Sequence, residues 1–128
     1  MKTEYALRAL YQLSLAKDSV HRSQISEDQG IPAPYLEQIL ISLKKAGLVR
    51  SIRGPGGGYQ LAKPGNQITV WDIYSAVEMP AFSGERCFPG MKNECDRLSA
   101  CKIKNVWAKI NTSVRESMQS LTLNSITA

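Results

Sequence analysis

The 128-residue chain lacks the features of a membrane or exported protein. None of its apolar runs approaches the ~18 residues that a membrane-spanning helix requires. The N-terminal stretch MKTEYALR carries one acidic and two basic residues within a helical pattern, unlike a signal peptide. Hydrophobic residues make up 43% of the chain and charged residues 21%, which suits one globular domain with a modest core. We therefore expect a cytoplasmic protein with no membrane contact.

Histidine is nearly absent from the sequence. Catalytic arrangements that depend on histidine therefore have little support. The one histidine, His21, lies between the first two predicted helices, and we interpret it as a surface residue. The chain shows no paired carboxylates suited to catalysis, and no G-x-G-x-x-G follows a predicted strand. The sequence therefore argues against an enzyme.

Acidic residues are absent between Gln38 and Trp71, although this stretch carries five basic residues: Lys44, Lys45, Arg50, Arg53 and Lys63. The stretch accounts for the whole formal net charge of +5, because the charges of the remaining residues cancel. Clustered Lys and Arg favour binding to a polyanion, whose counterions they release. A solvated basic face would give the same pattern, and charge alone slightly favours that interpretation.

A pair of helices joined by a glycine-containing turn is predicted after an N-terminal helix. Apolar residues at spacings of three and four predict the N-terminal helix over residues 4–16. Ser23 is the expected N-cap of the next helix, which runs through Gln29 and ends before Gly30. The following helix has Pro34 in its first turn and closes at Gly47. Its inward stripe comprises Leu36, Ile39, Leu40 and Leu43, and its polar outer face comprises Tyr35, Gln38, Ser42 and Lys45. This arrangement predicts a helix-turn-helix.

Glycine is concentrated in one stretch, RGPGGGYQL, which begins at Arg53 and holds four of the nine glycines. The stretch is not a P-loop, because Tyr59 and a β-prone run follow the glycines in place of Lys-Ser/Thr and a helix. Gly56 to Gly58 permit positive φ, and Pro55 favours a turn, so we predict a β-hairpin. After a helix-turn-helix such a hairpin is a wing, with Arg53 at its tip placed to enter a DNA groove.

A cysteine-containing loop and a long helix follow. Thr69 is the expected N-cap of a helix that continues to Val77. Residues 79–101 have no useful periodicity and are interpreted as a loop. From Lys102 an apolar stripe recurs over five turns: Ile103, Val106, Trp107, Ile110, Val114, Met118 and Leu121. Such a helix packs on its own domain or, as we prefer, on the first helix and on a second copy of the chain.

The predicted fold class is mainly α with a small β-hairpin: a winged helix-turn-helix plus a long C-terminal dimerisation helix. We divide the chain into a DNA-binding domain (1–78), a cysteine loop (79–101), and a dimerisation helix with its tail (102–128).

Two motifs carry a resemblance to a known family. The block PYLEQIL is followed by KKAGLV and then by RGPGGGY, and EYALRAL opens the chain. This pattern closely resembles the winged-helix regulators typified by IscR, NsrR and RirA, the Rrf2 family. The resemblance extends over nearly the whole chain, and the family fold is a winged helix-turn-helix with a long dimerisation helix.

The resemblance implies that Tyr35, Glu37 and Gln38 lie at the groove-facing start of the recognition helix, and that Arg53 reads the minor groove. Glu37 either accepts a hydrogen bond from a cytosine amino group or discourages wrong sequences. The full set of expected DNA contacts is Tyr35, Glu37, Gln38, Ser42, Lys44, Lys45, Arg50, Arg53, Gly56, Gly57 and Tyr59. Pro32 and Pro34 replace serines that are usual in the family, so the operator preference can differ from that of the relatives.

The three cysteines, Cys87, Cys95 and Cys101, form a C-x7-C-x5-C pattern. An odd count in an expected cytoplasmic chain argues against a disulfide framework. The spacing is too wide for a zinc knuckle, and the fourth thiolate of a ferredoxin-like cluster is missing. The residues alone leave a metal site and three free thiols equally open. The resemblance implies an iron–sulfur cluster, since this spacing is most like that of the RirA-type members, with [4Fe–4S] slightly favoured over [2Fe–2S].

A fourth cluster ligand must come from elsewhere. IscR-like proteins place a histidine three residues after the last cysteine, where this chain has Lys104, which cannot ligate when protonated. NsrR-like proteins use an acidic residue of the partner subunit just before an A-L-R run, and this chain has Glu4 in that position. The resemblance therefore implies Glu4 of the second copy as the fourth ligand.

The leading prediction is a homodimeric transcriptional regulator that binds a palindromic operator in double-stranded DNA. Its labile cluster would sense iron, cluster supply, or redox or nitrosative stress. Gain or loss of the cluster would reorder residues 80–101 and thereby change DNA affinity. The alternative is a cluster-free regulator of the same fold that uses its thiols for zinc binding or reversible oxidation.

Overall fold

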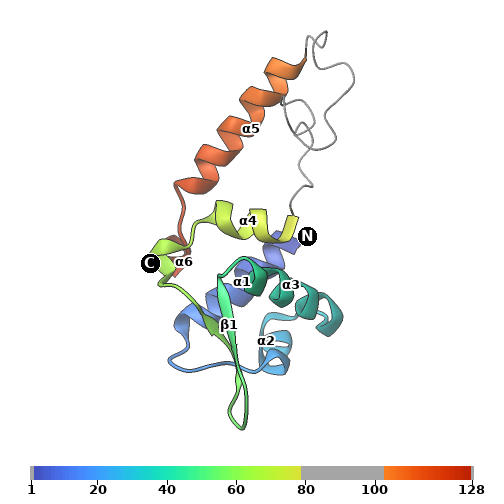
Figure 1. Ribbon diagram of the computed structural model, residues 1–128, viewed down its shortest axis with the longest axis vertical. Helices are drawn as coiled ribbons and strands as arrows, with labels where there is room; N and C mark the ends of the chain where they lie inside the picture. The colour runs from blue at the N-terminus through green and yellow to red at the C-terminus, as the bar shows by residue number, and fades with distance from the viewer. Residues whose placement is uncertain (1, 79–102, 128) are drawn as a thin grey trace.

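The computed structural model describes residues 2–78 and 103–127 (Figure 1). The described elements, in chain order, are α1 (Lys2–Leu15), α2 (Arg22–Gln29), α3 (Ala33–Lys45), β1 (Val49–Ile52), β2 (Gly58–Leu61), a 3-10 turn η1 (Gly65–Gln67), α4 (Val70–Glu78), α5 (Lys104–Gln119) and α6 (Leu123–Thr127). The fold is mainly helical with one two-stranded antiparallel sheet, as expected from the sequence. None of the described helices is both long and apolar enough to cross a membrane.

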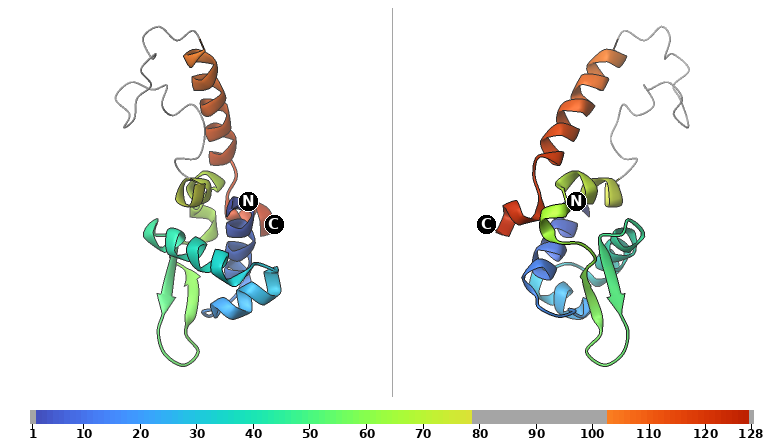
Figure 2. Two further views of the ribbon diagram at one scale, coloured as in Figure 1. Left: turned by 90° about the vertical axis from the view of Figure 1, so that its right-hand side faces the viewer. Right: turned by 60° about the vertical axis from the view of Figure 1, so that its left-hand side comes forward.

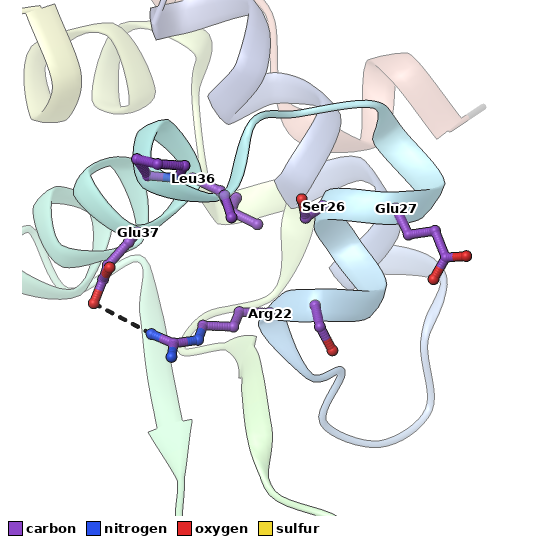
Figure 3. Close-up of a pocket in the computed structure, with 8 residues that line it drawn as sticks. Arg22, Ser26, Glu27, Leu36 and Glu37 are labelled. Atoms are coloured by element: carbon purple, nitrogen blue, oxygen red, sulfur yellow. Dashed lines mark hydrogen bonds and ion pairs between the residues drawn. The ribbon is translucent and has the colours of Figure 1, made fainter.

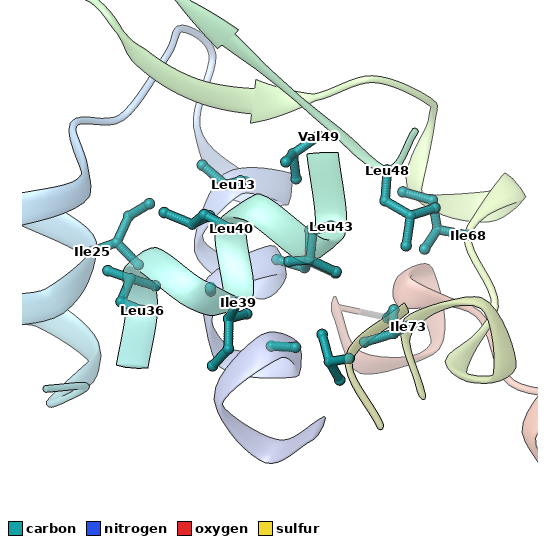
Figure 4. Packing of buried hydrophobic residues seen from close by; sticks show 14 of the residues in the cluster. Leu13, Ile25, Leu36, Ile39, Leu40, Leu43, Leu48, Val49, Ile68 and Ile73 are labelled. Atoms are coloured by element: carbon teal, nitrogen blue, oxygen red, sulfur yellow. The ribbon is translucent and has the colours of Figure 1, made fainter. Parts of the chain in front are cut away.

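The hydrophobic core lies between α1, α3 and α4 (Figure 4). The predicted inward stripe of α3 is buried in full, because its members repeat at helical spacing and face α1. On α1, the small residues Ala6 and Ala9 and the larger Leu10 and Leu13 are buried. Ile25 of α2 and Ile73 of α4 complete the core from two sides.

The turn between α2 and α3 follows the prediction at Gly30, which adopts a left-handed conformation with φ +63°. The predicted N-cap of α2 is wrong. His21, and not Ser23, occupies the cap position, because His21 has extended backbone and its Nδ1 accepts a hydrogen bond from the Ser23 backbone N–H at 3.2 Å. Ser23 lies within the first turn of the helix.

The end of α3 leads directly into the wing. Gly47 adopts φ +77°, its N–H donates to the carbonyl of Lys44, and the next N–H, that of Leu48, donates to the carbonyl of Leu43. Leu43 and Leu48 are both buried, so the same turn that ends the helix anchors it in the core. Strand β1 begins one residue later and pairs with β2 from Val49↔Leu61 to Ile52↔Gly58.

Helix α4 begins at the predicted N-cap. The hydroxyl of Thr69 accepts from the Asp72 N–H at 3.1 Å, and the Asp72 carboxylate accepts from the Thr69 N–H at 3.0 Å. This reciprocal pair satisfies two backbone donors that the helix leaves open.

The C-terminal helix is shorter than predicted. Helix α5 ends at Gln119, so Leu121 does not continue its apolar stripe. The chain turns back instead, because Leu123 of α6 is fully buried in the core and its N–H donates to the carbonyl of Ile68. Figure 2 shows that α5 projects away from the winged domain while α6 returns to it.

Candidate nucleic-acid interface

The first turns of α3 present the predicted recognition residues to solvent. Tyr35, Glu37 and Gln38 are exposed, and Tyr35 is 58% accessible although its side chain is large and partly apolar. Pro32 stands at the N-cap and supplies no side-chain hydrogen bond to the helix. Pro34 has no N–H and the Leu36 N–H donates to the Pro32 carbonyl, so the first turn of α3 offers the N–H groups of Ala33 and Tyr35 to an anionic ligand, which the helix dipole favours at this end.

The basic residues between α3 and the wing differ in how firmly they are held. Lys44 donates to the Ser51 hydroxyl of β1 at 3.0 Å, whereas Lys45 is exposed and Ser42 is half-buried. Arg50 donates through Nε and Nη2 to the Gln60 amide oxygen across the sheet at 3.0 and 2.5 Å. These contacts fix Lys44 and Arg50 on an exposed surface of α3 and β1.

The tip of the wing is a tight turn that leaves Arg53 free. The Gly57 N–H donates to the Gly54 carbonyl at 2.9 Å across Pro55 and Gly56, and Gly56 has φ +74°. Gly57 does not have a positive φ, and glycine is required there for a steric reason. A Cβ at position 57 would lie 2.4 Å from the Ile52 carbonyl oxygen. Within residues 2–78 and 103–127, Arg53 has no hydrogen-bond or ion-pair partner, so its guanidinium is available to a ligand.

The wing is held at its tip turn and at the start of β2 by the linker between α1 and α2, a contact that the sequence did not indicate. The backbones of Val20 and Tyr59 exchange two hydrogen bonds of 2.8 Å, and the Ser19 hydroxyl donates to the Gly56 carbonyl at 2.8 Å. Gly58 permits this approach, because a Cβ there would lie 2.3 Å from the Val20 carbonyl oxygen. Tyr59, an expected DNA contact, is half-buried and packs against the core beside this linker.

Arg22 is a second feature that sequence reasoning missed. It is the first residue of α2, and its Nη1 lies 3.2 Å from Oε1 of Glu37 on α3 (Figure 3). Both side chains are more than half exposed, at 57% and 55%. Arg22 lines a pocket of about 390 Å³ between α2 and α3, and also a pocket of about 280 Å³ beside the wing. It therefore stands between the recognition helix and the wing.

A sequence model of the Rrf2 family, described as iron-dependent transcriptional regulators, matches residues 1–128. The chain belongs to the Rrf2 family. The resemblance stated from the sequence is confirmed, and the winged helix described above is that of a DNA-binding transcriptional regulator and not of an enzyme.

Individual relatives agree with this assignment. The Rrf2 chain is 36% identical to the HTH-type transcriptional regulator IscR of Cronobacter sakazakii over 127 residues, covering 98% of this chain and 76% of the relative. The solved structure of T. potens IscR is 32% identical to this chain, with a TM-score of 0.75. The match covers 99% of this chain and 83% of the T. potens chain. The structure of CymR, the global cysteine regulator of B. subtilis, has a TM-score of 0.73 and 27% identity over 98% of this chain and 92% of its own.

Of the metal ligands expected in this Rrf2 protein, the structure describes only Glu4. Cys87, Cys95 and Cys101 lie outside the described residues, and within the described ranges no group of three or more His, Cys, Asp or Glu side chains could hold a metal ion. Glu4 is exposed in the first turn of α1, where its carboxylate accepts from Arg8 at 2.5 Å. Glu4 is thus accessible from outside its own chain. Thiolates and carboxylates are ligand types that suit iron–sulfur or zinc binding.

Proposed function

We propose that this protein is a homodimeric regulator of transcription whose affinity for a palindromic operator depends on an iron–sulfur cluster. The observation that carries the proposal is the position of the three cysteines in the sequence, between α4 and α5. Helix α4 contacts α1, the recognition helix α3, and α5. A change at the cysteines can therefore be transmitted to the DNA-reading surface through the contact between α4 and α3. A cytoplasmic location and the division at residues 78 and 101 stay predictions.

The exposed half of α5 supports the homodimer. Ile103, Val106 and Ile110 are 59%, 58% and 39% accessible, although they lie at spacings that place them on one side of the helix. Val114 and Met118 continue that side toward α4 and are half-buried. An apolar side that is half-buried at one end and exposed at the other suits contact with a second copy of the chain.

Substitution of Val106 tests the dimer. Val106→Lys should shift the protein toward the monomer in sedimentation equilibrium, while Asn105→Lys, an exposed change on the other side of α5, should leave the dimer intact. Two recognition helices related by a two-fold axis would read two half-sites, so in vitro selection with the wild-type protein should return palindromic sequences. A monomeric wild-type protein, or selected sites without symmetry, would refute the dimeric interpretation.

Cys87, Cys95 and Cys101 would hold the cluster as thiolates, and Glu4 of the partner would complete the ligand set. When bound, the cluster would supply a group that is sensitive to oxygen, nitric oxide and iron supply. Lys104 cannot serve as a ligand in its protonated form. Glu4 would have to share its carboxylate with Arg8 or leave it, which makes the fourth bond weak and exchangeable. We favour [4Fe–4S] over [2Fe–2S].

Anaerobic purification decides between the cluster and the alternative. The proposal expects a brown protein with stoichiometric iron and sulfide, and loss of both in Cys95→Ala. Glu4→Ala should lower cluster stability toward oxygen, whereas Glu27→Ala, which also removes an exposed carboxylate, should not. The likeness to CymR supports the cluster-free alternative, in which the thiols bind zinc or are reversibly oxidised. A colourless protein without iron would favour that alternative.

A further inference from the structure

Glu37 is the only carboxylate in the sequence between Asp28 and Asp72, a range that includes the recognition helix and the wing. It lies on α3 beside Tyr35 and Gln38, the positions expected to face DNA. An uncompensated carboxylate there would repel the phosphates of any DNA sequence. The ion pair with Arg22 offsets part of that repulsion, since Nη1 of Arg22 lies 3.2 Å from Oε1 of Glu37.

The pair contributes little to the stability of the fold. Both side chains are more than half exposed, and such exposed pairs contribute about 0–1 kcal/mol. The two residues come from different helices and are 15 positions apart in the sequence. Their pairing therefore orients Glu37 relative to α2 and the wing, and Figure 3 shows the two side chains extended toward each other across the front of the helix pair.

Arg22 has donors that its contact with Glu37 does not use. A guanidinium carries five N–H donors, and the contact with Glu37 uses only one of the terminal nitrogens. The same side chain lines the pocket beside Ser51, Gly54 and Gly57 of the wing. Arg22 thus lies beside both surfaces expected to contact DNA, the start of α3 and the wing. Arg22 can therefore bind a phosphate while it holds Glu37.

We propose that Arg22 is a specificity-determining residue, which binds an operator phosphate and orients the Glu37 carboxylate to accept from a cytosine amino group. This inference rests on the proposed DNA-reading function. Arg22 acts on base readout through Glu37, so the two residues should be coupled in discrimination between base pairs. The phosphate contact itself should be independent of sequence.

The test uses the full-length wild type, Arg22→Ala, Arg22→Lys, Glu37→Ala and the double variant Arg22→Ala/Glu37→Ala. Lys109→Ala, an exposed charge change on α5, controls for net charge. The probes are the wild-type-selected operator, its single base-pair variants and a random duplex, measured by fluorescence anisotropy at several salt concentrations. Circular dichroism verifies that each variant is folded, as expected for exposed positions.

The proposal expects Arg22→Ala to lose about tenfold in discrimination at the same base pair as Glu37→Ala. In the Glu37→Ala background, Arg22→Ala should change no base preference and should lower the salt slope by about one phosphate. Arg22→Lys should retain the salt slope and regain only part of the discrimination, because a lysine cannot hold a carboxylate and a phosphate in a fixed plane.

Two results would overturn the role of Arg22 and leave the proposed function standing. One is an equal loss on every sequence in Arg22→Ala while Glu37→Ala still changes base preference. The other is an effect of Arg22→Ala on base preference that is the same whether position 37 is Glu or Ala. A wild-type protein that does not distinguish any selected site from random DNA would overturn the proposed function itself, and with it this inference, so the two failures are distinguishable.

Discussion

The junction between the wing and the α1–α2 linker predicts a large effect from a single methyl group. In Gly58→Ala the added Cβ would lie 2.3 Å from the Val20 carbonyl oxygen and 2.7 Å from the His21 nitrogen. Both neighbours are backbone atoms, which cannot move away as a flexible side chain could. The substitution must therefore separate β2 from residue 20 and break the two 2.8 Å hydrogen bonds between Val20 and Tyr59.

The magnitude follows from two contributions. The positive φ of +152° at position 58 costs an alanine about 1–3 kcal/mol. Loss of the two hydrogen bonds adds about 0.5–1.5 kcal/mol each. Gly58→Ala should thus lower the free energy of unfolding by roughly 2–6 kcal/mol. Gly47→Ala is the matched control, because Gly47 has φ +77° but a Cβ there meets no atom within 4 Å. Gly47→Ala should show only the cost of the positive φ.

Urea unfolding at one fixed protein concentration measures both variants, since association with a second copy would otherwise shift the apparent stability. Anisotropy with the selected operator then measures DNA binding under conditions where each variant is folded. We expect Gly58→Ala to lose more specific binding than Gly47→Ala, because the wing that carries Arg53 is no longer held. Equal destabilisation of the two variants would refute the reasoning, since the contact with Val20 would then contribute nothing.

Other positions give predictions of smaller scope. Arg53→Ala should cost about 1–3 kcal/mol of specific binding, whereas Lys44→Ala should weaken binding to all sequences alike and flatten the salt dependence. Equal losses on specific and random DNA would remove Arg53 from the reading role. Thr69→Ala should destabilise the protein by about 1 kcal/mol in urea unfolding, because the reciprocal cap with Asp72 is lost, and no change would contradict that cap. Leu123→Ala should cost about 2–5 kcal/mol, and an unchanged midpoint would show that α6 is not anchored in the core.

Sequence reasoning succeeded where the signal is local. The stripe of α3, the left-handed residue Gly30 and the positive φ of Gly56 and Gly58 are each specified by neighbours within a few positions, and the structure places them as predicted. Gly57 does not have the positive φ that the stretch suggested. Thr69 was recognisable as a cap for the same reason, because the Asp that completes the pair is three residues away.

The features that were missed depend on contacts between distant segments. Nothing near Arg22 indicates a partner 15 residues later, and nothing near Ser19 indicates a wing carbonyl 37 residues later. Leu121 continues the apolar spacing of α5, so only the burial of Leu123 reveals that the helix has already ended. The cap of α2 was misassigned because serine is the commoner cap, whereas His21 supplies a ring nitrogen in the same position. The cysteine ligands stay a prediction.

The short return of the chain through α6 has a mechanical consequence. The bridge between Thr69 and Thr122, with the hydrogen bonds from Val70 to Leu121 and from Leu123 to Ile68, closes the chain into a ring at the start of α4. Helices α4 and α5 are therefore tied together at this junction, and they also contact each other. Because α4 contacts α3 as well, a tilt of α5 about the junction would act on α3 through α4.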